Sequence, residues 1–167
     1  MVKVLDRKGN GYSSDVLAGI SWVLERKEQL GIRILNISVG ACSKRGMSEN
    51  SALVKGVNRA WDAGLVVVVA AGNNGPRTMS ITTPGISRKV ITVGCSDDDR
   101  EVLVGGNRMV DYSGRGPTAA CICKPDLVAP GCSVVSCSSR ADKYTIKSGT
   151  SMSTPIVSGA VALLLER

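Results

Sequence analysis

Residues 65–75 have the sequence Leu-Val-Val-Val-Val-Ala-Ala-Gly-Asn-Asn-Gly. The run from Leu65 to Ala71 is apolar without interruption, which is typical of a parallel strand that is buried on both faces. Ligands of α/β sheets bind at the carboxyl ends of the strands, and here the strand ends in small residues followed by the amide Asn73. Such an amide can donate a hydrogen bond to a developing oxyanion, whereas an isolated Gly-Asn pair more often marks only a turn.

Helices and strands alternate on both sides of this segment. Helical spacing of apolar residues predicts three helices: one from Ser13 or Ser14 to Gly31, one over about 51–62, and one from about Ser151. The last is nearly all small or apolar, so we expect it to be buried. Further strands are predicted at 2–5, 32–37 and 90–93, a hairpin at 102–110, and weaker strands at 134–135 and 144–146. This order predicts one α/β domain with a mostly parallel sheet and right-handed crossovers.

A second motif opens the last of these helices, with the sequence Ser148-Gly149-Thr150-Ser151-Met152-Ser153-Thr154-Pro155. A serine at the start of a helix has unpaired backbone N–H groups and the positive end of the helix dipole beside it. Both favour an oxyanion that forms next to the Ser151 hydroxyl, and Gly149 lets a peptide backbone come close. Taken alone, the motif more often marks only a helix cap.

Together and in this order, the two motifs resemble those of the subtilisin-like serine protease family. Similar segments elsewhere are Gly9-Asn10-Gly11-Tyr12, Asn36-Ile37-Ser38-Val39-Gly40, Thr83-Pro84-Gly85, and the stretches at 112–117 and 124–131. The resemblance extends over essentially all 167 residues. It implies a three-layer α/β sandwich with a mostly parallel sheet, and a serine endopeptidase that acts on polypeptide substrates.

The resemblance implies a role for each matching residue. Ser151 would attack the scissile carbonyl, and the Asn73 side chain and the Ser151 backbone N–H would hold the oxyanion. Substrate would bind as an added strand between two segments, beside small residues that leave room for a side-chain pocket. The substrate-binding positions implied in this way are Gly9, Asn10, Gly11, Ser38, Val39, Gly40, Ala71, Gly72, Gly149 and Thr150.

The sequence departs from the family's pattern in its catalytic base. It contains no histidine, and the family's catalytic Asp and His lie before the core strand that residues 2–5 resemble. Without a base, Ser151 is a poor nucleophile, so we expect negligible activity from these 167 residues alone. The Asp-bearing strand of the family would lie between the strands at 2–5 and 32–37. We therefore expect an incomplete sheet in a chain, 1–167, that forms part of a catalytic domain whose N-terminal part lies upstream.

Three interpretations of the function follow from these residues. The favoured one is the C-terminal part of the catalytic domain of an active subtilisin-like endopeptidase, because Ser151, Asn73 and both substrate-flanking segments persist. The alternative is a non-catalytic, peptide-binding relative with the same fold. An unrelated α/β hydrolase is disfavoured, because the Gly-x-Ser-x-Gly elbow of those enzymes is absent.

The composition disfavours several other classes of function. The chain has 21 Lys and Arg against 14 Asp and Glu, but the basic residues form scattered pairs without interleaved aromatics. This pattern predicts no nucleic-acid partner. The absence of histidine excludes His metal sites and a complete Ser-His-Asp triad within the chain. No apolar run approaches the roughly 18 residues of a membrane helix, so no membrane partner is predicted.

Six cysteines, at 42, 95, 121, 123, 132 and 137, allow three interpretations. The run of four from Cys121 to Cys137 can be drawn as a zinc site, but its spacing fits no common zinc pattern. Disulfides are a second alternative. Small buried residues in a reducing compartment are favoured, since Cys95 and Cys132 lie in apolar or Gly-flanked stretches. Because the N-terminus also lacks a signal-peptide layout, the sequence favours the cytoplasm, with secretion as the alternative.

For one acidic run, Asp97-Asp98-Asp99, calcium binding is an alternative that the family resemblance suggests, since several loops of the family bind calcium. A solvated turn after a strand is the favoured interpretation of this run. The sequence therefore predicts no required cofactor and no metal site.

Overall fold

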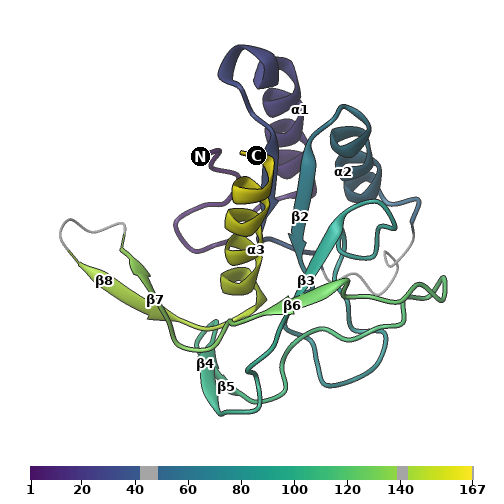
Figure 1. The fold of residues 1–167 in the computed structure, drawn as a ribbon. Helices are drawn as coiled ribbons and strands as arrows, with labels where there is room; N and C mark the ends of the chain where they lie inside the picture. The colour runs from purple at the N-terminus through teal and green to yellow at the C-terminus, as the bar shows by residue number, and fades with distance from the viewer. Residues whose placement is uncertain (42–48, 139–142, 167) are drawn as a thin grey trace.

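The computed structural model describes residues 1–41, 49–138 and 143–166, which form a layered α/β fold (Figure 1). A four-stranded sheet lies at its centre, with the strand order β1-β2-β3-β6. The strands are β1 (Ile34–Ile37), β2 (Val66–Ala70), β3 (Ile91–Cys95) and β6 (Leu127–Ala129). Every neighbouring pair is parallel, so all four carboxyl ends lie along the same edge of the sheet.

Helices cover both faces of the sheet and make it the middle layer. α1 (Ser13–Leu30) and α2 (Ala52–Asp62) pack together on one face, and α3 (Thr150–Leu165) packs on the other. Val67 and Val69 of β2 join the core under α1 and α2, whereas Val68 joins the core under α3. The predicted strand buried on both faces is therefore confirmed, and so is the three-layer sandwich.

Two antiparallel hairpins lie outside the sheet. β4 (Val102–Val104) pairs with β5 (Asn107–Met109), and β7 (Val134–Cys137) pairs with β8 (Tyr144–Lys147). All four strands were predicted, whereas β6 was not. Pro125 and Pro130 flank β6, and prolines at such positions indicate a loop rather than a strand in a sequence.

Local capping sets the helix boundaries. α1 ends at Gly31, which adopts a left-handed φ of +62° as a helix-ending glycine does. It begins one residue earlier than a Ser13 cap would place it, because the Tyr12 N–H donates to the Asp15 carboxylate at 3.0 Å. α2 follows Ser51, whose Oγ accepts the Val54 N–H at 3.3 Å.

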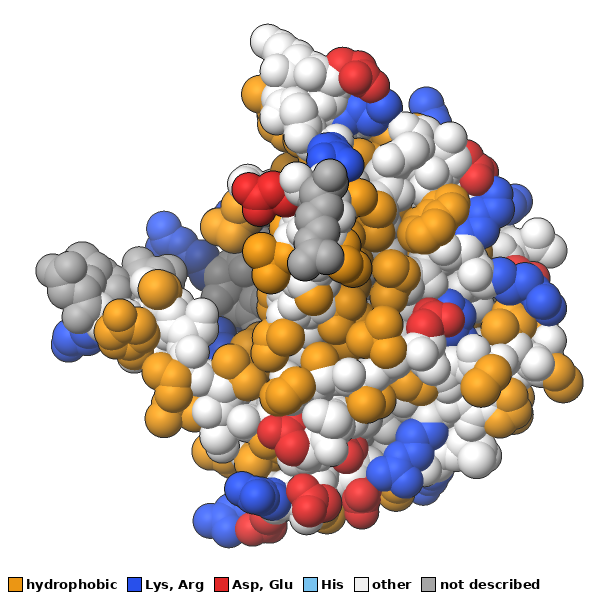
Figure 2. Space-filling model, viewed as in Figure 1, with side chains coloured by type: hydrophobic (Ala, Val, Ile, Leu, Met, Phe, Trp, Pro, Cys, Tyr) orange, Lys and Arg blue, Asp and Glu red, His pale blue; other side chains and the backbone are white. Residues whose placement is uncertain are grey.

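The prediction that the last helix is buried is wrong for its outer face. Val157 packs into the core, but Leu163 and Leu164 are 69% and 70% exposed. Figure 2 shows apolar side chains gathered over α3 and the adjacent face of the sheet. Within the described residues, the sheet covers only the inner side of this helix. No helix in the described ranges is long and apolar enough to span a membrane.

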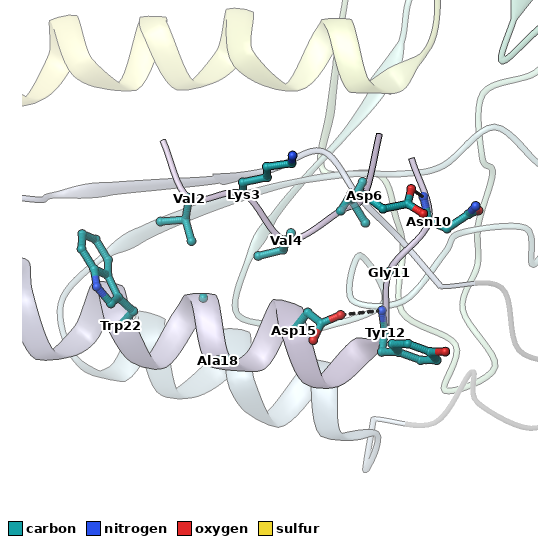
Figure 3. Close-up of a pocket in the computed structure, with 12 residues that line it drawn as sticks. Val2, Lys3, Val4, Asp6, Asn10, Gly11, Tyr12, Asp15, Ala18 and Trp22 are labelled. Atoms are coloured by element: carbon teal, nitrogen blue, oxygen red, sulfur yellow. Dashed lines mark hydrogen bonds between the residues drawn. The ribbon is translucent and has the colours of Figure 1, made fainter. Parts of the chain in front are cut away.

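The predicted strand at 2–5 is also wrong. Residues 1–12 contain no strand, and the sheet ends at β1, on whose free edge no other described strand pairs. The segment lies along α1, where a Cβ on Gly19 would meet Val4 Cγ1 at 2.9 Å. Together with α1 it lines a cavity of about 890 Å³ (Figure 3). A strand requires a hydrogen-bonded neighbour, and the described residues provide none here.

Candidate active site

Three elements bring polar groups to the carboxyl edge of the sheet. Ser38 follows β1, residues 71–73 follow β2, and α3 begins beside them at Thr150. Such an edge is where α/β sheets bind their ligands. The groups surround a cavity of about 210 Å³ that is lined by Ser38, Gly40, Ala70, Gly72, Asn73, Asn74, Thr82, Thr150 and Ser151.

Ser151 lies in the first turn of α3, two residues after the N-cap Gly149. Its Oγ donates a hydrogen bond to the Ser38 carbonyl oxygen at 2.9 Å, and the Ser38 Oγ donates to the Ser151 carbonyl oxygen at 3.2 Å. The Ser151 backbone N–H belongs to the turn whose N–H groups lack acceptors within the helix and where the dipole is positive. A hydroxyl and a backbone donor of one residue therefore lie together beside the cavity.

Asn73 is oriented by Thr150, the residue before Ser151. The Thr150 backbone N–H donates to Asn73 Oδ1 at 3.0 Å, and the Thr150 hydroxyl donates to the same oxygen at 3.1 Å. That hydroxyl also accepts the Gly72 N–H at 3.1 Å. Because a backbone N–H can only donate, Oδ1 must face Thr150 and Nδ2 must face away. Nδ2 lies 3.3 Å from the position that a Cβ on Gly149 would take, so the amide donors lie next to the start of α3.

Thr82 fills the space between two glycines of the cavity wall. A Cβ on Gly72 would lie 2.3 Å from Thr82 Cγ2, and a Cβ on Gly40 would lie 2.6 Å from Thr82 Oγ1. The φ of Gly72, +92°, is also one that L side chains rarely adopt. Sequence reasoning missed Thr82, because it belongs to neither motif and no signal in the sequence points to it.

Two of the predicted substrate-binding positions, Ala71 and Val39, do not line this cavity. Ala71 is fully buried in a core cluster with Val54, Ile81 and Ile86, and Ala70 lines the cavity instead. Val39 packs against the core under α1 and α2. In an extended segment, successive side chains point to opposite sides. A residue next to one that faces the cavity therefore faces the core, which explains both positions.

The predicted substrate-flanking segment 9–11 does not line the cavity beside Ser151. Asn10 and Gly11 line the larger cavity along α1 instead (Figure 3). The turn that contains Gly9 is held by Asp6, whose Oδ1 accepts the backbone N–H groups of Lys8 and Asn10 at 2.8 Å each. Of the predicted positions, the structure brings together Ser38, Gly40, Gly72, Asn73, Gly149, Thr150 and Ser151.

No general base faces Ser151 in the described part of the chain. The nine residues that line the cavity are Ser, Thr, Asn, Gly or Ala, and none of these side chains titrates near neutral pH. The Ser151 hydroxyl therefore has a carbonyl as its acceptor rather than an imidazole or a carboxylate. A serine in this environment keeps an ordinary, weakly nucleophilic hydroxyl.

A cluster of titratable groups lies near the start of α3, around Gly131. Burial raises the pKa of the Cys95 thiol to about 11, and it also raises the pKa of the Tyr112 hydroxyl. The pKa of Asp97 is lowered instead. Burial of Asp97 opposes this shift, but hydrogen bonds from the Cys95 thiol and from the Gly131 and Cys132 N–H groups outweigh it. Sequence reasoning missed this cluster, because its members are up to 37 positions apart.

The acidic run differs from a solvated turn. Asp98 is buried, and its carboxylate accepts the Ser113 N–H at 2.7 Å. Asp97 is half-buried and accepts two further backbone N–H groups, whereas Asp99 is exposed. The run is therefore part of the hydrogen-bonded framework that connects β3 to the loops around it.

The cysteines also differ from the favoured interpretation. Cys95 is buried as predicted and Cys132 is half-buried, but Cys121, Cys123 and Cys137 are exposed. All five are free thiols, and the suggested four-thiolate site at 121–137 is not assembled among the described residues. Cys42 lies outside the described residues.

Comparison with known proteins identifies relatives along the whole chain. The model of the subtilase family (Peptidase_S8) matches residues 1–167. Serine protease AprX from Bacillus subtilis (strain 168) is 39% identical over 183 residues, which cover 99% of this chain and 41% of that protein. Subtilisin DY from Bacillus licheniformis is 34% identical over 168 residues, which cover 99% of this chain and 53% of that protein. This chain thus spans about half the length of the curated relatives it matches.

Solved structures agree with the sequence relatives. Sphericase superposes with a TM-score of 0.75 at 34% identity, over 96% of this chain and 51% of that chain. A structure described as S41 psychrophilic protease superposes with a TM-score of 0.70 at 30% identity, over 96% and 52%. None of these relatives supports the expected cytoplasmic location, so secretion stays an alternative.

Proposed function

This chain belongs to the subtilase family, and from that premise we propose that it supplies the nucleophile and the oxyanion hole of a serine endopeptidase. The observation that carries the proposal is the hydrogen-bonded arrangement of Asn73, Thr150 and Ser151 at the carboxyl edge of the sheet. It combines a hydroxyl with two kinds of N–H donor, which are the nucleophile and the oxyanion donors of an acyl-transfer site.

In the proposed reaction, Ser151 Oγ attacks the carbonyl carbon of the scissile peptide bond. The carbonyl oxygen becomes an oxyanion and accepts hydrogen bonds from the Asn73 amide and the Ser151 backbone N–H. Thr150 fixes the amide before substrate binds, so little reorganisation is needed as charge develops. A base from outside these 167 residues takes the Ser151 hydroxyl proton and gives it to the amine as the amine leaves, and water then hydrolyses the ester formed on Ser151.

Substrate is proposed to bind as an extended strand beside Ser38, Val39 and Gly40. The cavity of about 210 Å³ is proposed to take one substrate side chain. The Ser38 carbonyl now accepts the Ser151 hydroxyl, so a substrate N–H that donates to this carbonyl competes with that contact. Binding of substrate would in this way release the hydroxyl toward the scissile bond.

The base must come from residues outside these 167. The chain contains no histidine, and no carboxylate among the described residues lines the cavity. The oxyanion hole and binding alone leave about 10³–10⁴-fold catalysis over water in subtilisin, which is the enzyme behind that value. We therefore propose that the chain is inactive alone and contributes to activity as part of the longer domain that its relatives possess.

A serine-directed fluorophosphonate probe tests this proposal. We expect labelling in the full-length protein that contains this chain and negligible labelling in residues 1–167 alone. Ser151→Ala should abolish the labelling, whereas Cys121→Ser, a change at an exposed thiol, should not affect it. Labelling that survives in Ser151→Ala would disprove the assignment of the nucleophile.

A non-catalytic, peptide-binding relative is the second candidate. The observation in its favour is the Ser151 hydroxyl, which is paired with a carbonyl and has no base beside it in the part of the chain that the structure describes. In that case the full-length protein would bind extended peptides without reacting with the probe. Peptide binding measured by fluorescence anisotropy, in parallel with labelling, separates the two functions.

A further inference from the structure

A cluster near α3 carries ligand chemistry that the proposed peptide hydrolysis does not use. It consists of Cys95 at the end of β3, Asp97 two residues later, Cys132 after Gly131, and the buried Tyr112. The two Sγ atoms and an Asp97 carboxylate oxygen all lie within 4.8 Å of one another. In the described part of the chain, no other three Cys, Asp or Glu side chains come together in this way.

Contacts within the protein already hold these atoms in place. Asp97 Oδ1 accepts the N–H groups of Gly131 and Cys132 at 2.7 and 3.2 Å, and the Cys95 thiol donates to it at 3.0 Å. The Tyr112 hydroxyl lies 3.2 Å from Cys95 Sγ and 3.1 Å from Cys132 Sγ. The candidate ligands are therefore oriented before any ion arrives, which is the requirement for a preformed site.

An unpartnered hydroxyl is a second observation at the same place. Ser153 Oγ is fully buried and has no hydrogen-bond partner among the described residues. A Cβ on Gly131 would lie 2.3 Å from Ser153 Oγ and 2.8 Å from Cys95 Sγ, so both atoms pack closely against the backbone of Gly131, beside the cluster. Buried hydroxyls are nearly always hydrogen-bonded. The Ser153 hydroxyl is therefore an unusual buried polar group next to the cluster.

We propose that Cys95, Asp97 and Cys132 bind a Zn²⁺ ion, a site that the sequence did not predict. Thiolates and a carboxylate are ligands of zinc, at about 2.3 Å for sulfur and about 2.0–2.2 Å for oxygen. In a tetrahedral zinc site with these bond lengths the ligand atoms lie about 3.5–3.8 Å apart, and the atoms here all lie within 4.8 Å of one another. The fourth position is open to the Tyr112 hydroxyl or to a water. Each thiol loses its proton to solvent as the ion binds, so one Zn²⁺ replaces two protons.

The ion would connect the end of β3 to residues 131–133, which contact the start of α3. The Gly149 N–H donates to the Gly131 carbonyl oxygen at 2.9 Å, and the Ser133 N–H donates to Ser148 Oγ at 2.9 Å. Residues 131–133 thus contact the two residues that precede α3. Zinc at this place stabilises the start of α3 without contact with Ser151, and the proposal does not depend on protease activity.

Metal titration of the reduced, metal-free protein tests the site, with Cd²⁺ as a spectroscopic substitute for Zn²⁺. We expect one equivalent of Cd²⁺ to produce cadmium–thiolate absorption, Zn²⁺ to displace it, and either ion to raise the midpoint of thermal unfolding. Cys132→Ser should weaken binding at least about 10-fold, since the loss of an outer-shell partner alone costs that much. Asp97→Asn should also weaken binding, while its Oδ1 keeps the backbone contacts to Gly131 and Cys132.

The exposed thiols provide the matched control. The double variant Cys121→Ser, Cys123→Ser should bind Cd²⁺ with the affinity of the wild type, because both residues lie outside the cluster. Cys95→Ser alters a buried residue, so the decisive variant is Cys132→Ser, at a half-buried position. Circular dichroism first checks that the Cys132→Ser variant is folded. Unchanged affinity in Cys132→Ser, or binding that disappears in the double variant, would overturn the proposal.

Discussion

Two segments of this chain were predicted as strands from their valines and have different structures. Val66–Ala70 forms β2, with β1 and β3 as neighbours and a layer of helix on each face. Val2–Leu5 also contains β-branched residues, with valine at two of its four positions, but it forms no strand and lines a cavity of about 890 Å³. The difference is one of partners, since a strand needs hydrogen-bonded neighbours as well as a suitable sequence.

The same difference divides the candidate site. We call β2, residues 71–73 and the first turn of α3 the central region, and residues 1–12 the N-terminal region. In the central region, Asn73 and Ser151 are fixed by hydrogen bonds to Thr150 and Ser38. In the N-terminal region, the predicted substrate segment 9–11 lies beside α1. The predicted site residues that follow the paired strands β1 and β2 thus surround the cavity beside Ser151, whereas residues 9–11 lie away from it.

The largest expected effect concerns the nucleophile of the central region. Ser151→Ala in the full-length protein should lower kcat by about 10⁶-fold, the size of the loss in subtilisin when its serine is removed. Peptide cleavage measured under single-turnover conditions checks this. A loss of less than about 10-fold would show that the organised half of the site does not perform the chemistry.

The Asn73 amide should have the next largest effect. Asn73→Ala is expected to lower kcat by about 10²–10³-fold, as loss of the corresponding donor does in subtilisin. Asn73→Asp sharpens the test, because it keeps an acceptor for Thr150 but removes the N–H donors. Equal losses in kcat for both variants would show that Asn73 acts by donating a hydrogen bond to the oxyanion. Near-normal kcat in Asn73→Asp would show that it acts by accepting the hydrogen bonds of Thr150.

A matched pair of valines tests the packing difference directly. Val68→Ala, at a fully buried position of β2, should lower the free energy of unfolding by about 2–3 kcal/mol through lost burial and a new cavity. Val2→Ala, at a position that is 40% exposed, should change it by less than about 0.5 kcal/mol. Urea unfolding followed by circular dichroism measures both. Similar losses would mean that the N-terminal region is packed as tightly as the sheet.

The smallest expected effect is a pH dependence near the central region. The pKa of Asp97 is lowered in the folded protein, by hydrogen bonds that outweigh burial. A carboxylate with a depressed folded pKa contributes stability above its unfolded pKa of about 3.9 and loses it as the pH falls toward the folded value. Asp97→Asn should flatten the acid side of the stability profile. Unfolding midpoints between neutral and acidic pH check this, with Cys121→Ser as the control that should follow the wild type.

Sequence reasoning succeeded where the signal was local. The apolar run at 65–71, the cap at Gly31 and the hairpin at 102–110 could be identified because adjacent residues carry their signals. It failed where the structure of a segment depends on which other parts of the protein pack against it. The outer face of α3 and the segment 2–5 are apolar in sequence, but only tertiary packing decides whether an apolar face is covered.

The candidate site follows the same division. Ser151 and Asn73 could be found because their motifs are contiguous, and their order along the chain gave the family resemblance. Thr82 and the group of Cys95, Asp97 and Cys132 could not be found, because each is assembled from distant positions.

The sequence by itself determined the parallel α/β class and the chemistry available to the chain: a serine, an amide and no histidine. Composition and local periodicity carry that information, and no folding is needed to read it. Tertiary structure alone decided that Thr150 orients the Asn73 amide, that Thr82 shapes the cavity, and that two thiols meet a carboxylate beside α3. Each of these is a contact between segments far apart in the chain, and such contacts exist only once the parallel strands align their carboxyl ends.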